Sequence, residues 1–186
     1  MELLRKTVID SKNHHHDNAD KRQLFTKEHH PDTTAFHRKQ WLFIENMVVR
    51  KNIAYQMQYL EFLIYIYNDY QIYLMIESLL CKDIIVTVSG VVEAALLDLV
   101  QSARKKAGMP MEDRTDFIML LGQAYHEHGL LTKDLWHYFH NLRKIRNEVH
   151  LTTADFKEYA GAGYSIGQAN ECIERLEEFR IGVSRN

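Results

Sequence analysis

Residues 133–150 read KDLWHYFHNLRKIRNEVH, and this stretch decides the fold class. Its apolar residues follow one another at steps of three and four: Leu135, Phe139, Leu142, Ile145 and Val149. A stripe with that spacing predicts an amphipathic helix that packs its apolar side against neighbouring helices. Thr132 directly precedes the stretch and is expected to cap the helix.

Helical spacing continues through most of the remaining chain. The chain has only two prolines, Pro31 and Pro110, and a protein built of strands would need more turn-forming residues than this sequence supplies. We expect helices at residues 36–70, as one helix or as two broken near Lys51-Asn52, and further helices at 71–80, 84–106, 115–127 and 166–181. Their expected starts and stops are Asp32-Thr33, Asn68-Asp69, Asp83, Gly108 with Pro110, Asp113, Gly129 and Ser165. The sequence therefore predicts an all-α fold, an antiparallel bundle of five to seven helices.

Length and composition indicate one domain of the 186 residues with a polar arm before it. Residues 1–31 are polar, rich in histidine and without periodicity, so we expect a flexible arm followed by a helical domain at 32–186. The adjacent histidines at 14–16 and 29–30, with His37, lack fixed ligand geometry. We therefore expect no metal site and no cofactor.

Several features indicate a soluble, cytoplasmic protein. No signal peptide is recognisable, and the most apolar stretch, residues 59–67, is too short to span a bilayer and contains Glu61. Cys81 and Cys172 are too few for a disulfide framework and are expected to be buried, reduced thiols. Lysine and arginine total 23 against 25 acidic residues, so any nucleic-acid binding must depend on a local patch.

The polar edge of the helix at 133–150 offers such a patch. Arg143, Asn147 and His150 have the spacing that stacks side chains on one helix face, and Arg146 lies about a sixth of a turn away. A histidine exchanges a proton near neutral pH, and an arginine donates to phosphate oxygens as charge develops on them. This combination suits RNA cleavage without a metal.

Two considerations limit that interpretation. Cationic residues near a helix C-terminus also complement the helix dipole, and spacing alone favours this explanation of the edge as a cap. One histidine and one arginine are few for general acid and general base catalysis together. A two-fold dimer would double the set and would concentrate the charges of Arg143, Lys144 and Arg146 in one cleft.

The segment 142–150 resembles the motif of HEPN proteins, the higher eukaryote and prokaryote nucleotide-binding domain family. Its ribonuclease members carry an arginine, four to six intervening residues and a histidine, which Arg143 and His150 match. The Arg-Asn pair typical of the family is Arg146-Asn147 here, three residues before His150, so the resemblance leaves open which arginine is catalytic. It covers residues 50–183 and implies a homodimeric, metal-independent endoribonuclease, a toxin or antiphage-defence enzyme with a possible cognate antitoxin or regulatory protein. Some relatives are catalytically inactive modules that bind RNA, nucleotide or protein.

A second match to the family lies at residues 89–96, where a small residue and Glu93 precede an apolar run. We expect Glu93 to reach Arg146 or Arg143 and hold its side chain, the alternative being an exposed glutamate. Lys144 and His140 are expected to line the cleft, whereas His137 is expected to face solvent.

A dense aromatic series at residues 55–73 has two possible roles. It includes Tyr55, Tyr59, Phe62, Tyr65, Tyr67, Tyr70 and Tyr73. These rings could stack on bases, but their helical spacing favours core and subunit interface.

Overall fold

The computed structural model describes residues 30–110, 116–147 and 164–185, apart from the side chains of Leu74 and Asn147. Within these ranges the protein has six α-helices, one π-helical turn and no strand, which confirms the all-α bundle. The elements are α1 (Thr34–Gln40), α2 (Met47–Asp69), α3 (Leu74–Lys106), α4 (Phe117–Gly122), η3 (Gln123–Glu127), α5 (Lys133–Asn147) and α6 (Ile166–Ser184). The expected arm at residues 1–31 lies almost wholly outside the described residues.

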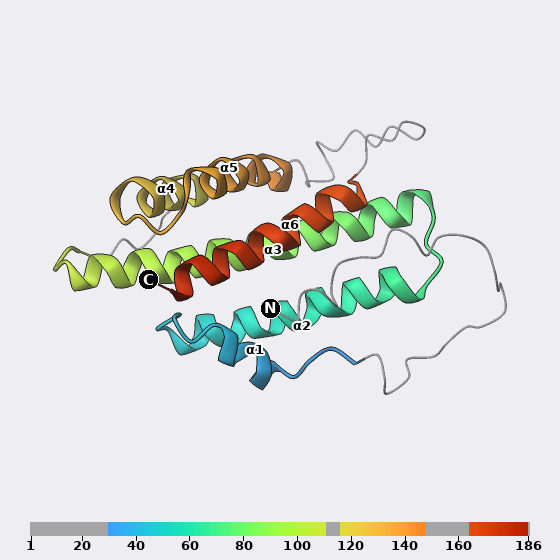
Figure 1. The fold of residues 1–186 in the computed structure, drawn as a ribbon, viewed down its shortest axis with the longest axis horizontal. Coiled ribbons are helices and arrows are strands. Elements are labelled where there is room, and N and C mark those ends of the chain that lie inside the picture. The colour runs from blue at the N-terminus through green and yellow to red at the C-terminus, as the bar shows by residue number, and fades with distance from the viewer. Residues whose placement is uncertain (1–29, 111–115, 148–163, 186) are drawn as a thin grey trace.

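Helix α3 is the central element of the bundle. Its 33 residues extend about 50 Å at the rise of an α-helix. It contacts α2, α4, η3, α5 and α6. In Figure 1, α1 and α2 lie on one side, α4 and α5 lie on the other, and α3 and α6 run between them. The core therefore lies on both sides of α3, where Val88, Val92, Leu96 and Val100 are buried.

The expected helix start at Asp83 is wrong, because α3 runs through it from Leu74. Cys81, Ile84 and Ile85 are buried on the core side of this helix, whereas Asp83 is exposed. An exposed aspartate is tolerated inside a helix whose apolar side continues without a gap. The expected break at Asn68-Asp69 is confirmed, since α2 ends at Asp69.

The break within residues 36–70 lies at 41–46, not near Lys51-Asn52. Helix α2 begins after Asn46, whose side chain accepts hydrogen bonds from the backbone N–H groups of Val48 and Val49. Lys51 and Asn52 are both exposed on α2 and do not interrupt it.

Two side chains, Asp98 of α3 and Arg50 of α2, fix the connection between α1 and α2. The buried carboxylate of Asp98 on α3 accepts from the backbone N–H of Glu45 at 2.8 Å and of Asn46 at 3.1 Å. Nε of Arg50 donates to the carbonyl of Ile44 at 2.8 Å. This turn is therefore determined by tertiary contacts.

Local signals at the remaining helix ends are largely confirmed. Gly108 and Gly129 have φ angles of 69° and 63°, a backbone conformation that glycine adopts without strain. The Thr132 hydroxyl accepts from the backbone N–H of Leu135, and Ser165 forms a capping box with Gln168. The residue before α4 is Asp116, and the start expected at Asp113 lies outside the described residues.

The aromatic series divides between core and surface. Tyr67 is buried, but Tyr55, Tyr59, Tyr70 and Tyr73 keep between 40% and 59% of their surface. The core interpretation is wrong for these four tyrosines. Aliphatic residues such as Leu60 and Ile64 fill the core side of α2, and Tyr70 and Tyr73 lie in the connection between α2 and α3. Their place in a subunit interface stays a prediction. Both cysteines are buried and free, as expected.

Candidate functional site

Helix α5 carries the residues that the sequence singles out, and its core side is as expected. Leu135, Phe139 and Leu142 are buried, and Ile145 packs against the core from a partly buried position. The Phe139 ring meets Phe179 of α6 edge to face, with 5.8 Å between the ring centroids. These contacts fix the rotation of α5, and they leave its polar edge outside the core.

Arg146 is held by Glu93 of α3, one of the two partners that the sequence predicted for this glutamate. Nη1 of Arg146 donates to Oε2 of Glu93, and the side chains of Arg146 and Glu93 are 36% and 29% exposed. The pair joins α5 to α3 at the border between core and solvent. Arg146 is therefore oriented by a neighbouring helix, which is how a supporting residue would be placed.

Arg143 lies about 60° around α5 from Arg146 at the angular step of an α-helix. Its side chain is half-buried, and its Nε has no hydrogen-bond partner among the residues that the structure describes. Lys144 is exposed beside it. These two cationic side chains and Arg146 gather at the C-terminal end of α5, where they complement the helix dipole and would also attract a phosphate.

The sequence also predicted three residues at or beyond the end of α5 as part of this site or of the core stripe: Asn147, Val149 and His150. His150 lies outside the described residues, as does Val149, and the side chain of Asn147 is not described. Their expected places on the polar edge and on the core stripe stay predictions.

His140 belongs to a stack of rings that the sequence did not reveal. Its imidazole lies 5.8 Å from the Trp136 ring at an interplanar angle of 27°, and Tyr125 of η3 lies 5.4 Å from Trp136 at 25°. His126 of η3 and His137 meet Trp136 edge to face. The spacing of Trp136 and His140 by four residues could have indicated their contact, but nothing local pointed to Tyr125.

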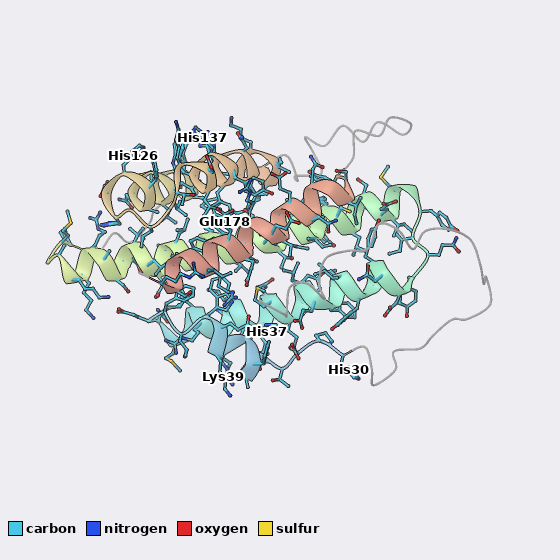
Figure 2. The ribbon with its side chains drawn as sticks, viewed as in Figure 1. His30, His37, Lys39, His126, His137 and Glu178 are labelled. Atoms are coloured by element: carbon cyan, nitrogen blue, oxygen red, sulfur yellow. The ribbon has the colours of Figure 1, made fainter. Side chains whose placement is uncertain are left out.

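The imidazoles of this cluster differ in their surroundings. His126 and His137 are exposed, as expected for His137, and Figure 2 shows both on the side of α4 and α5, away from His30 and His37. Desolvation, followed by the charges of Lys144, Arg143 and His137, lowers the pKa of His140 below its ordinary value. At neutral pH the His140 ring is therefore largely uncharged and suited to stacking.

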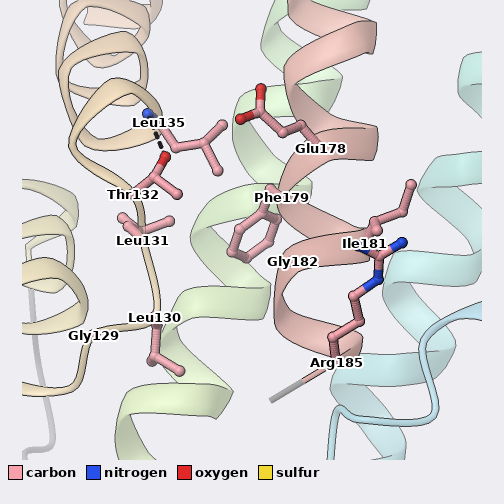
Figure 3. A pocket seen from close by; sticks show the side chains of 10 residues that line it. All are labelled: Gly129, Leu130, Leu131, Thr132, Leu135, Glu178, Phe179, Ile181, Gly182 and Arg185. Atoms are coloured by element: carbon pink, nitrogen blue, oxygen red, sulfur yellow. Dashed lines mark hydrogen bonds between the residues drawn. The ribbon is translucent and has the colours of Figure 1, made fainter.

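A shallow cavity lies at the other end of α5. It measures about 350 Å³ and is enclosed by the connection before α5 and by the end of α6. Figure 3 shows Leu131, Leu135 and Phe179 around it, with Glu178 and Arg185 on the α6 side. This cavity is formed near the N-terminus of α5 and does not include the cationic end.

Two further observations concern the described ranges as a whole. Among residues 30–110, 116–147 and 164–185, no three His, Cys, Asp or Glu side chains are grouped so that they could hold a metal ion. In the same part of the chain, no helix combines the length and apolar character needed to cross a membrane.

No protein-family model, curated protein or solved structure matches this chain. In the part of the chain that the structure describes, the protein is an all-α helical bundle with cationic side chains at the end of α5.

Proposed function

We propose that this protein is a metal-independent endoribonuclease of HEPN type that acts as a homodimer. The observation that carries the proposal is the group of Arg143, Lys144 and Arg146 at the end of α5, with Arg146 held by Glu93 from α3. This group directly precedes His150 in the sequence, the residue that the resemblance assigns to proton transfer.

The reaction needs proton transfer and stabilisation of negative charge. A base removes the proton of a ribose 2′-hydroxyl, the 2′-oxygen attacks the adjacent phosphorus, and the 5′-oxygen leaves with a proton from an acid. The products are a 2′,3′-cyclic phosphate and a 5′-hydroxyl. His150 would exchange these protons, and arginine would stabilise the charge on the phosphate oxygens.

The pairing on α3 supports different roles for the two arginines. Because Glu93 engages Arg146, this residue suits a supporting role that fixes the border of the site. Nε of Arg143 is buried and has no hydrogen-bond partner in the described part of the chain, so nothing there fixes this guanidinium as Glu93 fixes Arg146. We therefore assign the phosphate contact to the half-buried Arg143. Asn147 would orient His150, and Lys144 would add charge to the cleft.

A dimer supplies what one chain lacks. Two copies of the cationic end facing each other would provide two histidines, one as acid and one as base. They would also explain how a chain with nearly balanced charge binds a polyanion. The proposal predicts a dimer in solution and a loss of cleavage per chain on dilution into monomers.

The test is cleavage of RNA in the presence of a chelator. We expect wild-type protein to yield cyclic-phosphate ends. His150→Ala, which removes an acid–base group, and Arg143→Ala, which removes charge stabilisation, should each cut at least about a hundredfold more slowly. His30→Ala, an exposed histidine on the opposite side of the bundle, is the matched control and should cut normally. Equal cutting by wild type and His150→Ala, or none by either, refutes the proposal.

In a cell, such an enzyme would act as a toxin or in antiphage defence, restrained by an antitoxin or another regulatory protein. We expect expression of the wild-type protein to slow growth and His150→Ala to relieve the effect. The alternative function is a catalytically inactive helical module that binds RNA, which the exposed rings beside His140 favour. Wild-type protein that binds RNA without cutting it would establish that alternative.

A further inference from the structure

We propose that the ring cluster of Tyr125, His126, Trp136, His137 and His140 is a binding surface for the unpaired bases of single-stranded RNA. The inference deepens the proposed function by naming the form of RNA that the α5 site takes. It rests on that function only for the fate of the RNA, because binding to the rings requires no cleavage.

The rings come from two elements and are fixed in relation to one another. Tyr125 and Trp136 pack against the core from partly buried positions, which limits their movement. Tyr125, Trp136 and His140 are close to parallel, with 5.4 and 5.8 Å between neighbouring centroids. A stack that is already ordered loses little conformational freedom when another flat ring is added to it.

The cluster is also open to solvent. His126 and His137 are exposed, and Trp136 and His140 are half-buried. Trp41, by contrast, is completely buried in the core. The exposed edges of this cluster leave room for a ligand.

The surface changes from aromatic to cationic along one face of α5. Trp136, His140, Arg143 and Asn147 are spaced by four, three and four residues, which places them on one face over roughly 16 Å of helix. Lys144 adds a second cationic side chain beside Arg143. A strand of RNA with bases on the rings would present its phosphates to these cations.

Acidic residues also lie near this face, and Glu93 of α3 is already paired with Arg146. Glu127 is exposed beside His126. Asp134 is exposed in the first turn of α5, at the end of the helix away from Arg143 and Lys144. The aromatic and cationic face is therefore complementary to a polyanion that also has flat rings.

Single-stranded RNA matches this surface better than duplex RNA. Bases in a duplex stack on each other and hide both faces, and recognition of duplexes depends on the shape of the minor groove. Unpaired bases are free to stack on aromatic side chains, with little dependence on base identity.

The test uses RNA whose 2′-hydroxyls are methylated, so that it cannot be cleaved by 2′-oxygen attack. Binding of a fluorescent single strand is followed by anisotropy, and the same strand paired with its complement is the competitor. We expect the single strand to bind more tightly than the duplex. His140→Ala should weaken binding about tenfold, the effect of losing one stacking contact. His30→Ala, the exposed histidine on the opposite side, should bind as wild type does.

A second measurement depends on the two tryptophans of the chain. Because Trp41 is completely buried and Trp136 is not, RNA on the cluster should quench the emission of Trp136. Trp136→Phe keeps an aromatic ring, so it should lose the quenching while binding within about twofold of wild type. This measurement remains decisive if His140→Ala does not fold.

Several results would overturn the inference: equal affinity for single strand and duplex, unchanged binding by His140→Ala, or bound RNA that leaves Trp136 emission unaltered. Two outcomes separate this proposal from the proposed ribonuclease. Normal binding of methylated RNA without any cleavage of ordinary RNA by wild type would refute the ribonuclease and support the binding surface. Cleavage of RNA by wild type, with RNA binding unchanged in His140→Ala and emission quenching unchanged in Trp136→Phe, would support the ribonuclease and refute the binding surface.

Discussion

The contact between Glu93 and Arg146 leads to a prediction about both stability and activity. Glu93→Gln keeps the size of the side chain and removes its charge. The two side chains are 29% and 36% exposed, so water screens their attraction. We expect the pair to contribute about 1 kcal/mol, near the upper end for solvent-exposed ion pairs and well below the cost of breaking a buried one.

That magnitude can be measured in a double-mutant cycle. Urea unfolding of wild type, Glu93→Gln, Arg146→Ala and the double variant should give a coupling energy of about 1 kcal/mol. Thermal midpoints should fall by about 2–4 °C for each single variant, as expected at this chain length. The contact is between helices, so its loss also frees Arg146 to leave the edge.

A matched control is present on α6. Arg175 and Glu178 form an ion pair within one helix, with exposures of 35% and 45%. Glu178→Gln should cost about 0.3–0.5 kcal/mol and leave RNA cleavage unchanged. Glu93→Gln should lower the cleavage rate by up to about tenfold with little change in RNA affinity, because Glu93 acts through Arg146. A coupling energy indistinguishable from zero, or equal effects of the two variants on cleavage, would refute this reasoning.

Three further predictions concern other buried or charged groups. Asp98→Ala should lower the free energy of unfolding by about 3 kcal/mol, since it removes two charge-assisted hydrogen bonds to backbone N–H groups; Asp98→Asn keeps one acceptor and should lose about half, and urea unfolding that shows no difference between them would contradict this. Lys144→Ala should raise the pKa of His140 toward its ordinary value in an NMR titration, because it removes a charge that opposes protonation. Since the fold lowers the pKa of His140, this residue contributes stability above the ordinary imidazole pKa, and that contribution is lost as the pH falls through the lowered pKa of the folded state. An unchanged titration of His140 in Lys144→Ala would refute the assignment. Burial raises the pKa of Cys81 to about 11 and of Cys172 to about 12, so a thiol reagent at pH 8 should label both slowly in native protein and rapidly in denaturant, and fast labelling of native Cys172 would contradict its burial.

Helix content and most helix ends follow from the sequence. Thr132 and Ser165 cap helices through contacts within three residues, and Gly108 and Gly129 end them through their own backbone conformation. Such signals act locally, so they can be recognised without the fold. Periodicity also assigned Leu135, Phe139 and Leu142 to the core side of α5.

The two misplaced helix boundaries involve contacts with distant residues, although Asn46 also caps α2 locally through Val48 and Val49. The turn at residues 41–46 depends on Asp98, which is more than fifty residues away in the sequence. The helix through Asp83 persists because its neighbours Ile84 and Ile85 are buried against other helices. Packing outweighed the capping preference of an aspartate at that position.

By itself, the sequence determined that the chain is helical and that Arg143 and Arg146 lie at the polar edge of one helix, because helical spacing alone decides which side chains share a face. The tertiary structure decided what those side chains meet. It selected Arg146 as the partner of Glu93, and it brought Tyr125 of η3 onto Trp136 of α5. Contacts between helices depend on how the helices rotate and cross, which is set by the packing of the whole core and not by any one segment.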